Sequence, residues 1–349
     1  MEAEVLSQPA VWKECLAAFS DNPVLNEIST HVSRDAEWLF IGCGSSYYVA
    51  QAAATFFVTL GLRARAVPPS ELLLFPELTP DETSRDRVPV LISRSGRTSE
   101  VLQVAELLKK ERGLRSIAIT CSPQERLGSI ASFTLRALGA DEQSTVMTRS
   151  FTSMLMLLQY LGSAITKDDG LCEALLKLPD AFAPKMRTLH LEVQSFVSTR
   201  SFADYVFLAQ GPLFAIANEC SLKVTECSSS YSQVFHTLEF RHGPKSIVAP
   251  DVLTVFLLSE SGYEAEVGML EEVKSLGGTT VAIANRADER ALKAADLLIE
   301  LDLPIPETVR PVAFAPLGQL LGLFTGVKKG LNPDEPRHLS RVVILNSAV

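Results

Sequence analysis

The segment Ser93–Thr98 carries the clearest chemical signal in the chain. It reads Ser-Arg-Ser-Gly-Arg-Thr and follows an apolar run, Val88–Ile92. Its three hydroxyls can donate to phosphate oxygens, and Gly96 lets the backbone approach an anion closely. A helical pattern begins directly afterwards, and the free N–H groups and positive dipole end of a helix favour phosphate. The same residue types also cap helices. The turn therefore indicates either a phosphate site or a helix cap.

A second turn of the same kind comes earlier in the chain. Ser45 and Ser46 follow the apolar run Trp38–Ile41 and open another helical pattern that extends to about Leu60. In open α/β sheets, ligands bind beyond the carboxyl ends of the strands. Two hydroxyl-bearing turns in one set of strands favour phosphate binding over capping alone.

Acid–base chemistry is indicated by charged residues in the second half of the chain. Glu219, Lys223 and Glu226 fall at i, i+4 and i+7, on one face of a predicted helix. Such a stripe is often a solvated face, but here apolar and small residues surround it, so we expect the helix to be covered. Buried carboxylates beside a lysine are candidate general bases. His242 lies before a Gly-Pro break and is expected in an exposed loop, whereas His236 is expected to be structural.

The elements that must position these residues alternate between strands and helices. Alternation of this kind indicates βαβ units and a mainly parallel sheet covered on both faces, an α/β fold. In the first half, the predicted strands are Trp38–Ile41, Arg63–Val67, Val88–Ile92 and Ile117–Cys121.

The second half of the chain repeats this plan. Gly211 lies 167 residues after Gly44, and Gly262 lies 166 residues after Gly96. Two landmarks at nearly one spacing predict a tandem duplication, with strands at Tyr205–Ala209 and Leu253–Leu258. In the second copy of the turn, glutamates stand in place of Arg94 and Thr98. We therefore expect the second copy not to bind phosphate; these residues are Glu260 and Glu264.

The pattern divides the chain into five segments. We expect an N-terminal helical extension before the first domain, a helical linker between the two domains, and a C-terminal tail that completes the active site. Pro179 and Pro184 are predicted breaks within the linker. The predicted boundaries are 1–35, 36–166, 167–200, 201–328 and 329–349.

Composition excludes several classes of protein. With 32 basic and 41 acidic residues, the net charge is −9, and no basic run indicates a nucleic-acid surface. The first residues do not form a secretory signal, and no apolar stretch is long enough to span a membrane. The six cysteines are scattered without metal-ligand spacing. We expect reduced thiols in a cytoplasmic protein, with no metal and no cofactor.

Taken together, these motifs resemble the sugar isomerase (SIS) family, in particular the two-domain isomerase part of glucosamine-6-phosphate synthases. The resemblance covers nearly the whole chain and implies two flavodoxin-like SIS domains. It rests on short motifs whose order and spacing match, namely 42–46, 93–98, 148–151, 219–226, 239–244 and 332–339. By this resemblance, phosphate is held by Ser45, Ser46, Ser93, Arg94 through its backbone, Ser95 and Thr98.

The resemblance also implies catalytic roles. Glu226 matches the base that moves a proton between C1 and C2 of the open-chain sugar, and Lys223 matches a lysine near the reacting end. His242 matches a histidine for ring opening that comes from the partner subunit, which implies a homodimer with shared active sites. Arg341 stands where the synthases direct a lysine toward the sugar carbonyl. An arginine stays protonated and cannot readily form a Schiff base.

Two further departures from the synthases bear on function. The family's turn has Gln and Glu where this chain has Arg94 and Arg97, which either add positive charge near the phosphate or form surface pairs. We also expect no glutaminase domain before the first SIS domain. The expected function is therefore a stand-alone amino-sugar 6-phosphate isomerase or deaminase. The alternatives are a non-catalytic sugar-phosphate sensor and an isomerase subunit that pairs with a separate glutaminase.

Overall fold

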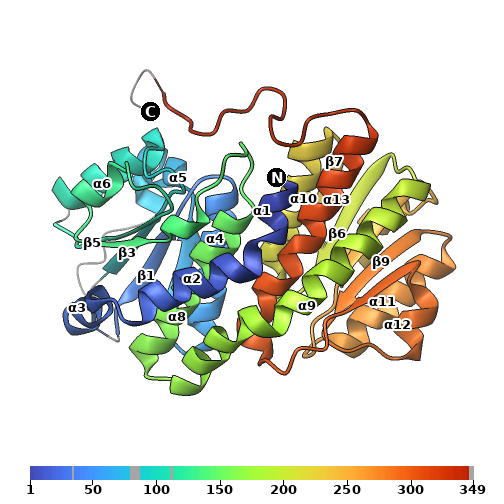
Figure 1. Ribbon diagram of the computed structural model, residues 1–349, viewed down its shortest axis with the longest axis horizontal. Coiled ribbons are helices and arrows are strands. Elements are labelled where there is room, and N and C mark those ends of the chain that lie inside the picture. Colours follow the sequence, from blue (N-terminus) through green and yellow to red (C-terminus); the bar gives the residue numbers. More distant parts are fainter. Residues whose placement is uncertain (34, 79–86, 111–112, 346–349) are drawn as a thin grey trace. The chain divides into compact units, whose positions relative to one another are not determined.

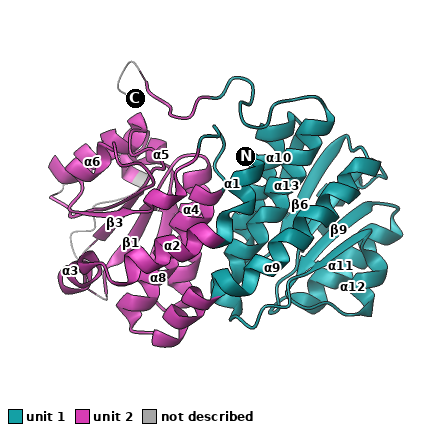
Figure 2. Cartoon of the chain, in the orientation of Figure 1, with its two compact units in different colours: residues 1–9, 143–148, 178–339 teal, residues 10–142, 149–177, 340–349 magenta. Residues whose placement is uncertain are grey.

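The computed structural model describes residues 1–33, 35–78, 87–110 and 113–345. Figure 2 shows that the chain forms two compact units. The first-copy unit contains Ala10–Glu142, Arg149–Lys177 and the residues from Ser340 onward. The second-copy unit contains Met1–Pro9, Gln143–Thr148 and Leu178–Leu339.

The first-copy unit is built on a five-stranded parallel sheet with strand order β2-β1-β3-β4-β5. Its central strand is buried along almost its whole length, as expected for a parallel sheet with both faces covered. The strands are β1 Glu37–Ile41, β2 Arg63–Val67, β3 Arg87–Ile92, β4 Ile117–Thr120 and β5 Phe133–Arg136.

Helices cover both faces of this sheet (Figure 1). On one face, Phe57 of α4 packs edge-on against Trp38 and Phe40, with ring centroids 4.9 Å from each. On the other face, α6 buries Val101 and Leu108 against β1, β3 and β4, as its helical spacing predicts. The helices are α2 Gln8–Ser20, which begins in the second-copy unit, α3 Pro23–His31, α4 Ser45–Thr59, α5 Pro69–Leu74, α6 Ser99–Lys110, α7 Leu127–Ile130 and α8 Arg149–Thr166.

The second-copy unit contains a five-stranded parallel sheet of the same topology, β10-β9-β8-β6-β7. Matching β1 with β6, and each later strand in turn, gives the same order in both sheets. This identity confirms the predicted duplication and the α/β fold of two parallel sheets. The strands are β6 Asp204–Ala209, β7 Tyr231–His236, β8 Val252–Leu257, β9 Thr279–Ala284 and β10 Leu297–Glu300.

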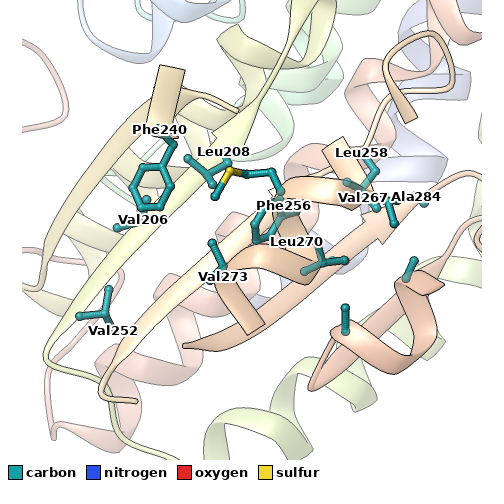
Figure 3. Packing of buried hydrophobic residues seen from close by; sticks show 14 residues of the cluster. Val206, Leu208, Phe240, Val252, Phe256, Leu258, Val267, Leu270, Val273 and Ala284 are labelled. Atoms are coloured by element: carbon teal, nitrogen blue, oxygen red, sulfur yellow. The ribbon is translucent and has the colours of Figure 1, made fainter. Parts of the chain in front are cut away.

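One face of the second sheet is covered by α11 and α12. Figure 3 shows the cluster that joins them to the sheet, in which Phe256 of β8 and Leu270 of α11 lie side by side. The opposite face is covered by α10, and α13 packs on α10. The helices of this unit are α1 Glu2–Leu6, α10 Phe214–Ser228, α11 Tyr263–Ser275, α12 Glu289–Ala294 and α13 Ala315–Lys328.

Three glycines let α13 pack directly against α10. A Cβ atom on Gly318 would overlap Cys220, one on Gly322 would overlap the backbone of Lys223, and one on Gly326 would overlap the carbonyl of Cys227. Because these glycines recur every four residues, they form one flat strip along α13. The close approach fixes α10, the helix that carries the predicted acid–base residues.

The predicted breaks at Pro179 and Pro184 are wrong. A single helix, α9, runs from Asp169 to Thr199 with both prolines inside it. Each proline removes one backbone hydrogen bond, but buried side chains recur every three or four residues along the helix, so packing holds it together. These residues are Leu175, Leu178, Phe182, Met186, Leu189 and Val193.

Candidate functional site

The turn after β1 places two hydroxyls at the start of α4. Gly44 has a φ of +56°, a conformation that favours glycine. A Cβ atom on Gly42 would overlap the backbone of Ser46. Ser45 and Ser46 are the first residues of α4 and both are buried. The two glycines therefore allow a tight turn that brings both serines to the helix N-terminus.

The turn after β3 is organised around Gly96, which has a φ of +61°. Ser93 and Thr98 share a hydrogen bond of 3.0 Å between their hydroxyls. Among the described residues, the N–H groups of Ser95 and Thr98 have no hydrogen-bond partner. These N–H groups can therefore donate to a ligand at the N-terminus of α6.

The two turns lie at the same edge of the sheet, because β1 and β3 are adjacent parallel strands. The structure thus brings all the predicted phosphate residues to the carboxyl ends of two neighbouring strands, where α/β sheets bind ligands. The thiol of Cys43 reaches Glu100 across the two turns, at 3.7 Å. Burial, together with Glu100, raises the pKa of Cys43 to about 12, so the thiol adds no negative charge here.

Arg94 does not form the surface pair that the sequence left open. It is buried, and its guanidinium pairs with the fully buried Glu142 at 3.5 Å. It also donates to the backbone carbonyl of Arg341, at 3.0 Å. Glu142 accepts a further hydrogen bond from Ser150. The side chain of Arg94 therefore points into an ion-paired interior, and it leaves only its backbone for a ligand of the turn.

The tail lies against this turn within the first-copy unit. Arg341 forms an ion pair with Asp141. The N–H of Ser99 donates to the carbonyl of Val343 at 3.3 Å, and the hydroxyl of Ser99 accepts from the N–H of Leu345 at 2.9 Å. A cleft of about 290 Å³ opens between the turn and the tail, lined by Arg94, Ser95, Arg97, Ser122, Pro123, Gln124, Asp141, Arg341 and Val342.

The predicted acid–base residues form a charged cluster on α10. Lys223 and Glu219 are completely buried, with 3.3 Å between the ammonium and the Glu219 carboxylate. Lys223 also pairs with Glu226, whose side chain is 18% exposed. The covered helix predicted from the sequence is therefore confirmed, and Glu226 is the member of the cluster that reaches the surface.

The neighbouring carboxylates keep the ammonium group of Lys223 protonated. Burial alone would lower the pKa of Lys223, but the carboxylates of Glu219 and Glu226 outweigh burial and hold that pKa above its ordinary value. A protonated ammonium therefore lies between the carboxylates of Glu219 and Glu226. The cluster thus presents a carboxylate at its open end that can accept a proton.

His242 is exposed on a loop that is fastened at two points. Phe240 lies in the hydrophobic core beside Val206 (Figure 3). On either side of His242, Arg241 and Lys245 both pair with Glu272 of α11, each at 2.8 Å. Within the described chain, His242 makes no hydrogen bond or ion pair with the α10 cluster. The exposed-loop prediction is confirmed, whereas His236, expected to be structural, is exposed and stacks on Phe214.

The corresponding turn of the second copy holds its glutamates in ion pairs. Glu260 pairs with Arg310 and Glu264 pairs with Arg290, both at 2.8 Å. The carboxylate that lies on the turn belongs instead to Glu307, which accepts from the N–H of Glu260 at 2.6 Å. Sequence analysis missed Glu307, because no motif connects it with a turn more than 40 residues earlier.

In the part of the chain that the structure describes, no group of three His, Cys, Asp or Glu side chains is arranged to hold a metal ion. No helix in the same residues combines the length and the apolar character needed to cross a bilayer.

Comparisons with known sequences place the chain beside enzymes of sugar-phosphate metabolism. It is 24% identical over 356 residues to the glutamine–fructose-6-phosphate aminotransferase of Thermococcus kodakarensis and 26% identical over 362 residues to that of Helicobacter pylori. These matches cover 98% of the chain but only 57% and 58% of the relatives. The chain thus spans somewhat more than half the length of these proteins.

Solved structures match the chain along its full length. A glucosamine-6-phosphate deaminase from Thermotoga maritima is 29% identical with a TM-score of 0.76, covering 98% of this chain and 100% of that one. The tagatose-6-phosphate ketose/aldose isomerase of Escherichia coli has a TM-score of 0.85 at 20% identity, covering 99% and 96%. The second likeness shows the shared fold.

The family itself is shown by a match that covers both copies. The SIS domain family matches residues 34–164 and 204–317, which include the two sheets and most of the helices that cover them. The phosphate-type turns after β1 and β3 lie in the first matched segment, and the charged cluster of α10 lies in the second. The chain belongs to the SIS domain family.

Proposed function

We propose that this protein is a phosphosugar isomerase that acts on amino-sugar 6-phosphates and couples aldose–ketose isomerisation to C–N bond breaking or formation. The observation that carries the proposal is the α10 cluster, in which the buried Lys223 forms an ion pair with the partly exposed side chain of Glu226. Support comes from the similarity to the Thermotoga maritima protein, named a glucosamine-6-phosphate deaminase.

The phosphate of the substrate binds to the first-copy unit. The proposed ligands are the hydroxyls of Ser45, Ser46, Ser93, Ser95 and Thr98, with the backbone of the turn at Arg94. The unpartnered N–H groups of Ser95 and Thr98 add two donors at the N-terminus of α6. This arrangement holds an anion without the side chain of Arg94, which faces inward.

The chemistry takes place at the other end of the sugar. His242 assists ring opening, and Glu226 removes the proton from C2 and returns it to C1 through an enolamine. Lys223 steadies the negative charge that develops on oxygen. The resulting imine at C2 is hydrolysed by water to a ketone and ammonia, so an amino-aldose phosphate gives a ketose phosphate.

The proposed enzyme is a cytoplasmic homodimer with shared active sites. In this arrangement His242 acts on the sugar held by the partner subunit, which fits its exposure and its lack of a bond to the α10 cluster. The tail, residues 329–349, completes the site, and the cation of Arg341 faces the sugar as a fixed charge. Because an arginine does not form a Schiff base readily, the proposed route has no covalent sugar intermediate through this residue.

The decisive variant is Glu226→Gln, which keeps the side chain's size but removes the base. Incubation of the wild type with glucosamine 6-phosphate in D₂O should release ammonia and give fructose 6-phosphate labelled at C1. Loss of a general base typically costs about 10²–10⁴-fold in rate, so turnover by the variant should collapse while sugar-phosphate binding persists.

Two controls separate the alternatives. Equal turnover by Glu226→Gln would refute the assigned base, and binding of sugar phosphate without turnover in the wild type would favour a sensor. Ammonia incorporation that needs both glutamine and a second protein would favour a subunit paired with a glutaminase. A matched variant, Glu272→Gln, loosens the His242 loop without touching α10 and should reduce the rate less.

A further inference from the structure

The turn after β8 has the construction of an anion site, although its own glutamates point elsewhere. The N–H groups of Glu260 and Ser261 both donate to one oxygen of Glu307, at 2.6 and 3.3 Å. The hydroxyl of Ser261 donates to the other oxygen at 2.7 Å. Successive N–H groups and a hydroxyl at a helix N-terminus are the donors that bind oxyanions in proteins.

The carboxylate on this turn has no cation of its own. Within the described residues Glu307 forms no ion pair, whereas the neighbouring glutamates pair with Arg310 and Arg290. The charge of Glu307 is therefore balanced by backbone and hydroxyl dipoles and by the N-terminus of α11. This is the environment in which a bound phosphate or sulfate would lie.

A buried cation completes the site. Arg310 is only 3% exposed and donates to Glu260 through one nitrogen, at 2.8 Å. Its Nε atom is buried without a hydrogen-bond partner among the described residues. A cavity just large enough for a water molecule, about 10 Å³, is lined by Arg310 together with Glu260, Asn285 and Glu307. A second guanidinium, that of Arg286, borders an open hollow of about 500 Å³ beside the turn.

We propose that this turn is a second oxyanion-binding nest and that the carboxylate of Glu307 occupies it. This carboxylate takes the place of a phosphate and so prevents phosphate from binding to the second copy. The nest is defined as the N–H groups of Glu260 and Ser261 with the hydroxyl of Ser261. Removing the carboxylate opens this nest to tetrahedral oxyanions such as inorganic phosphate. The nest plays no part in the proposed catalysis, so the failure of one proposal would leave the other unaffected.

The test uses Glu307→Ala in the full chain, with inorganic phosphate as the probe. In buffer without oxyanions, the variant should melt several degrees below the wild type. Added phosphate should restore its melting temperature by a larger shift than the wild type shows. Isothermal titration should show a phosphate-binding event absent from the wild type. Glu300→Ala, which removes an exposed glutamate of the same unit, should change neither quantity.

Two further variants show whether the gain comes from the nest. Adding Ser261→Ala to Glu307→Ala should abolish the gained phosphate binding, because the hydroxyl donor is lost. A folded Glu307→Ala that responds to phosphate like the wild type would overturn the proposal. If Glu307→Ala does not fold, Glu307→Gln should still weaken the protection of the Glu260 and Ser261 amides from hydrogen exchange. Unchanged protection would overturn the proposal as well.

Discussion

The turn after β3 and the turn after β8 follow the central strands of two sheets with one topology, yet their N–H groups differ in whether they have a hydrogen-bond partner. After β3, the N–H groups of Ser95 and Thr98 have no partner among the described residues. After β8, the N–H groups of Glu260 and Ser261 donate to the carboxylate of Glu307. The same scaffold is open in one copy and closed in the other.

The difference between the two turns depends on which groups the nearby carboxylates contact in each copy. In the first copy, Glu142 pairs with Arg94 and Asp141 pairs with Arg341, and among the described residues neither carboxylate accepts from the N–H groups of Ser95 and Thr98. In the second copy the two charges are exchanged, because the carboxylate of Glu260 lies on the turn and its partner Arg310 lies in the 3-10 helix Glu307–Phe314. We therefore expect Arg94 to act as the counter-ion that keeps a carboxylate away from the proposed phosphate position.

The backbones of the two turns also differ. Six residues, 93–98, separate β3 from α6, but only five, 258–262, separate β8 from α11. Gly96 has a φ of +61°, whereas Gly262 has a φ of −104°. The equal spacing of these glycines in the sequence identifies the duplication correctly. The two glycines nevertheless adopt different backbone conformations.

The largest predicted effect comes from breaking the ion pair between Arg94 and Glu142. Arg94→Ala removes an ion-pair partner of the buried Glu142, which should cost up to about 3–5 kcal/mol of unfolding free energy. Chemical denaturation measures this loss. The double variant Arg94→Ala with Glu142→Ala should recover much of it, and a double variant no more stable than the single one would show that the pair does not act in this way.

The second prediction concerns Glu266, a buried residue of α11 whose carboxyl group contacts the closed turn. It accepts from the N–H and hydroxyl of Ser259, at 2.6 and 3.1 Å. Burial raises its pKa to about 7 from an ordinary value of 4.5, with bonds from Ser259 opposing the rise and Glu307 adding to it. A carboxyl with a raised pKa binds its proton more tightly in the folded chain, so stability falls as pH rises from 4.5 to about 7.

Glu266→Gln should remove this pH dependence. Relative to the wild type, the variant should gain stability between pH 5 and pH 8, by at most about 3 kcal/mol. Melting temperatures at the two pH values measure the difference. Parallel pH profiles of the two proteins would show that Glu266 is already ionised at neutral pH.

A smaller effect is expected from matched serines in the two turns. Ser95→Ala removes a hydroxyl from the open turn and should raise KM for the sugar phosphate with little change in kcat, by a factor that corresponds to about 1.5–3 kcal/mol for a hydrogen bond to a charged group. Ser261→Ala makes the same change in the closed turn and should leave KM unaltered. Equal effects on KM would contradict the division between the two turns.

Much of the fold could be predicted from the sequence, because parallel strands that are buried on both faces consist of continuous runs of apolar residues. Arg63–Val67 was predicted with the bounds that the structure shows, and the other expected strands shift by a residue at most at either end. The cover over Glu219 and Lys223 was also predictable, since apolar residues surround them in the helix.

The partners of the charged residues could not be predicted in this way. Glu142 lies 48 residues from Arg94, and Glu307 lies 47 residues from Glu260. No periodicity connects such pairs, because the contacts depend on how loops meet at the edge of a sheet. The continuous helix through Pro179 and Pro184 could not be predicted either, because it also depends on tertiary contacts. Packing along its length outweighs the two lost hydrogen bonds.

The central claim is that the chain holds one sugar phosphate, in the first copy alone. Isothermal titration of Glu226→Gln with glucosamine 6-phosphate tests it most directly, because binding is measured without turnover. The account predicts one ligand per chain, with affinity weakened by Ser95→Ala and unchanged by Ser261→Ala. Two ligands per chain, or binding that depends on Ser261, would contradict it.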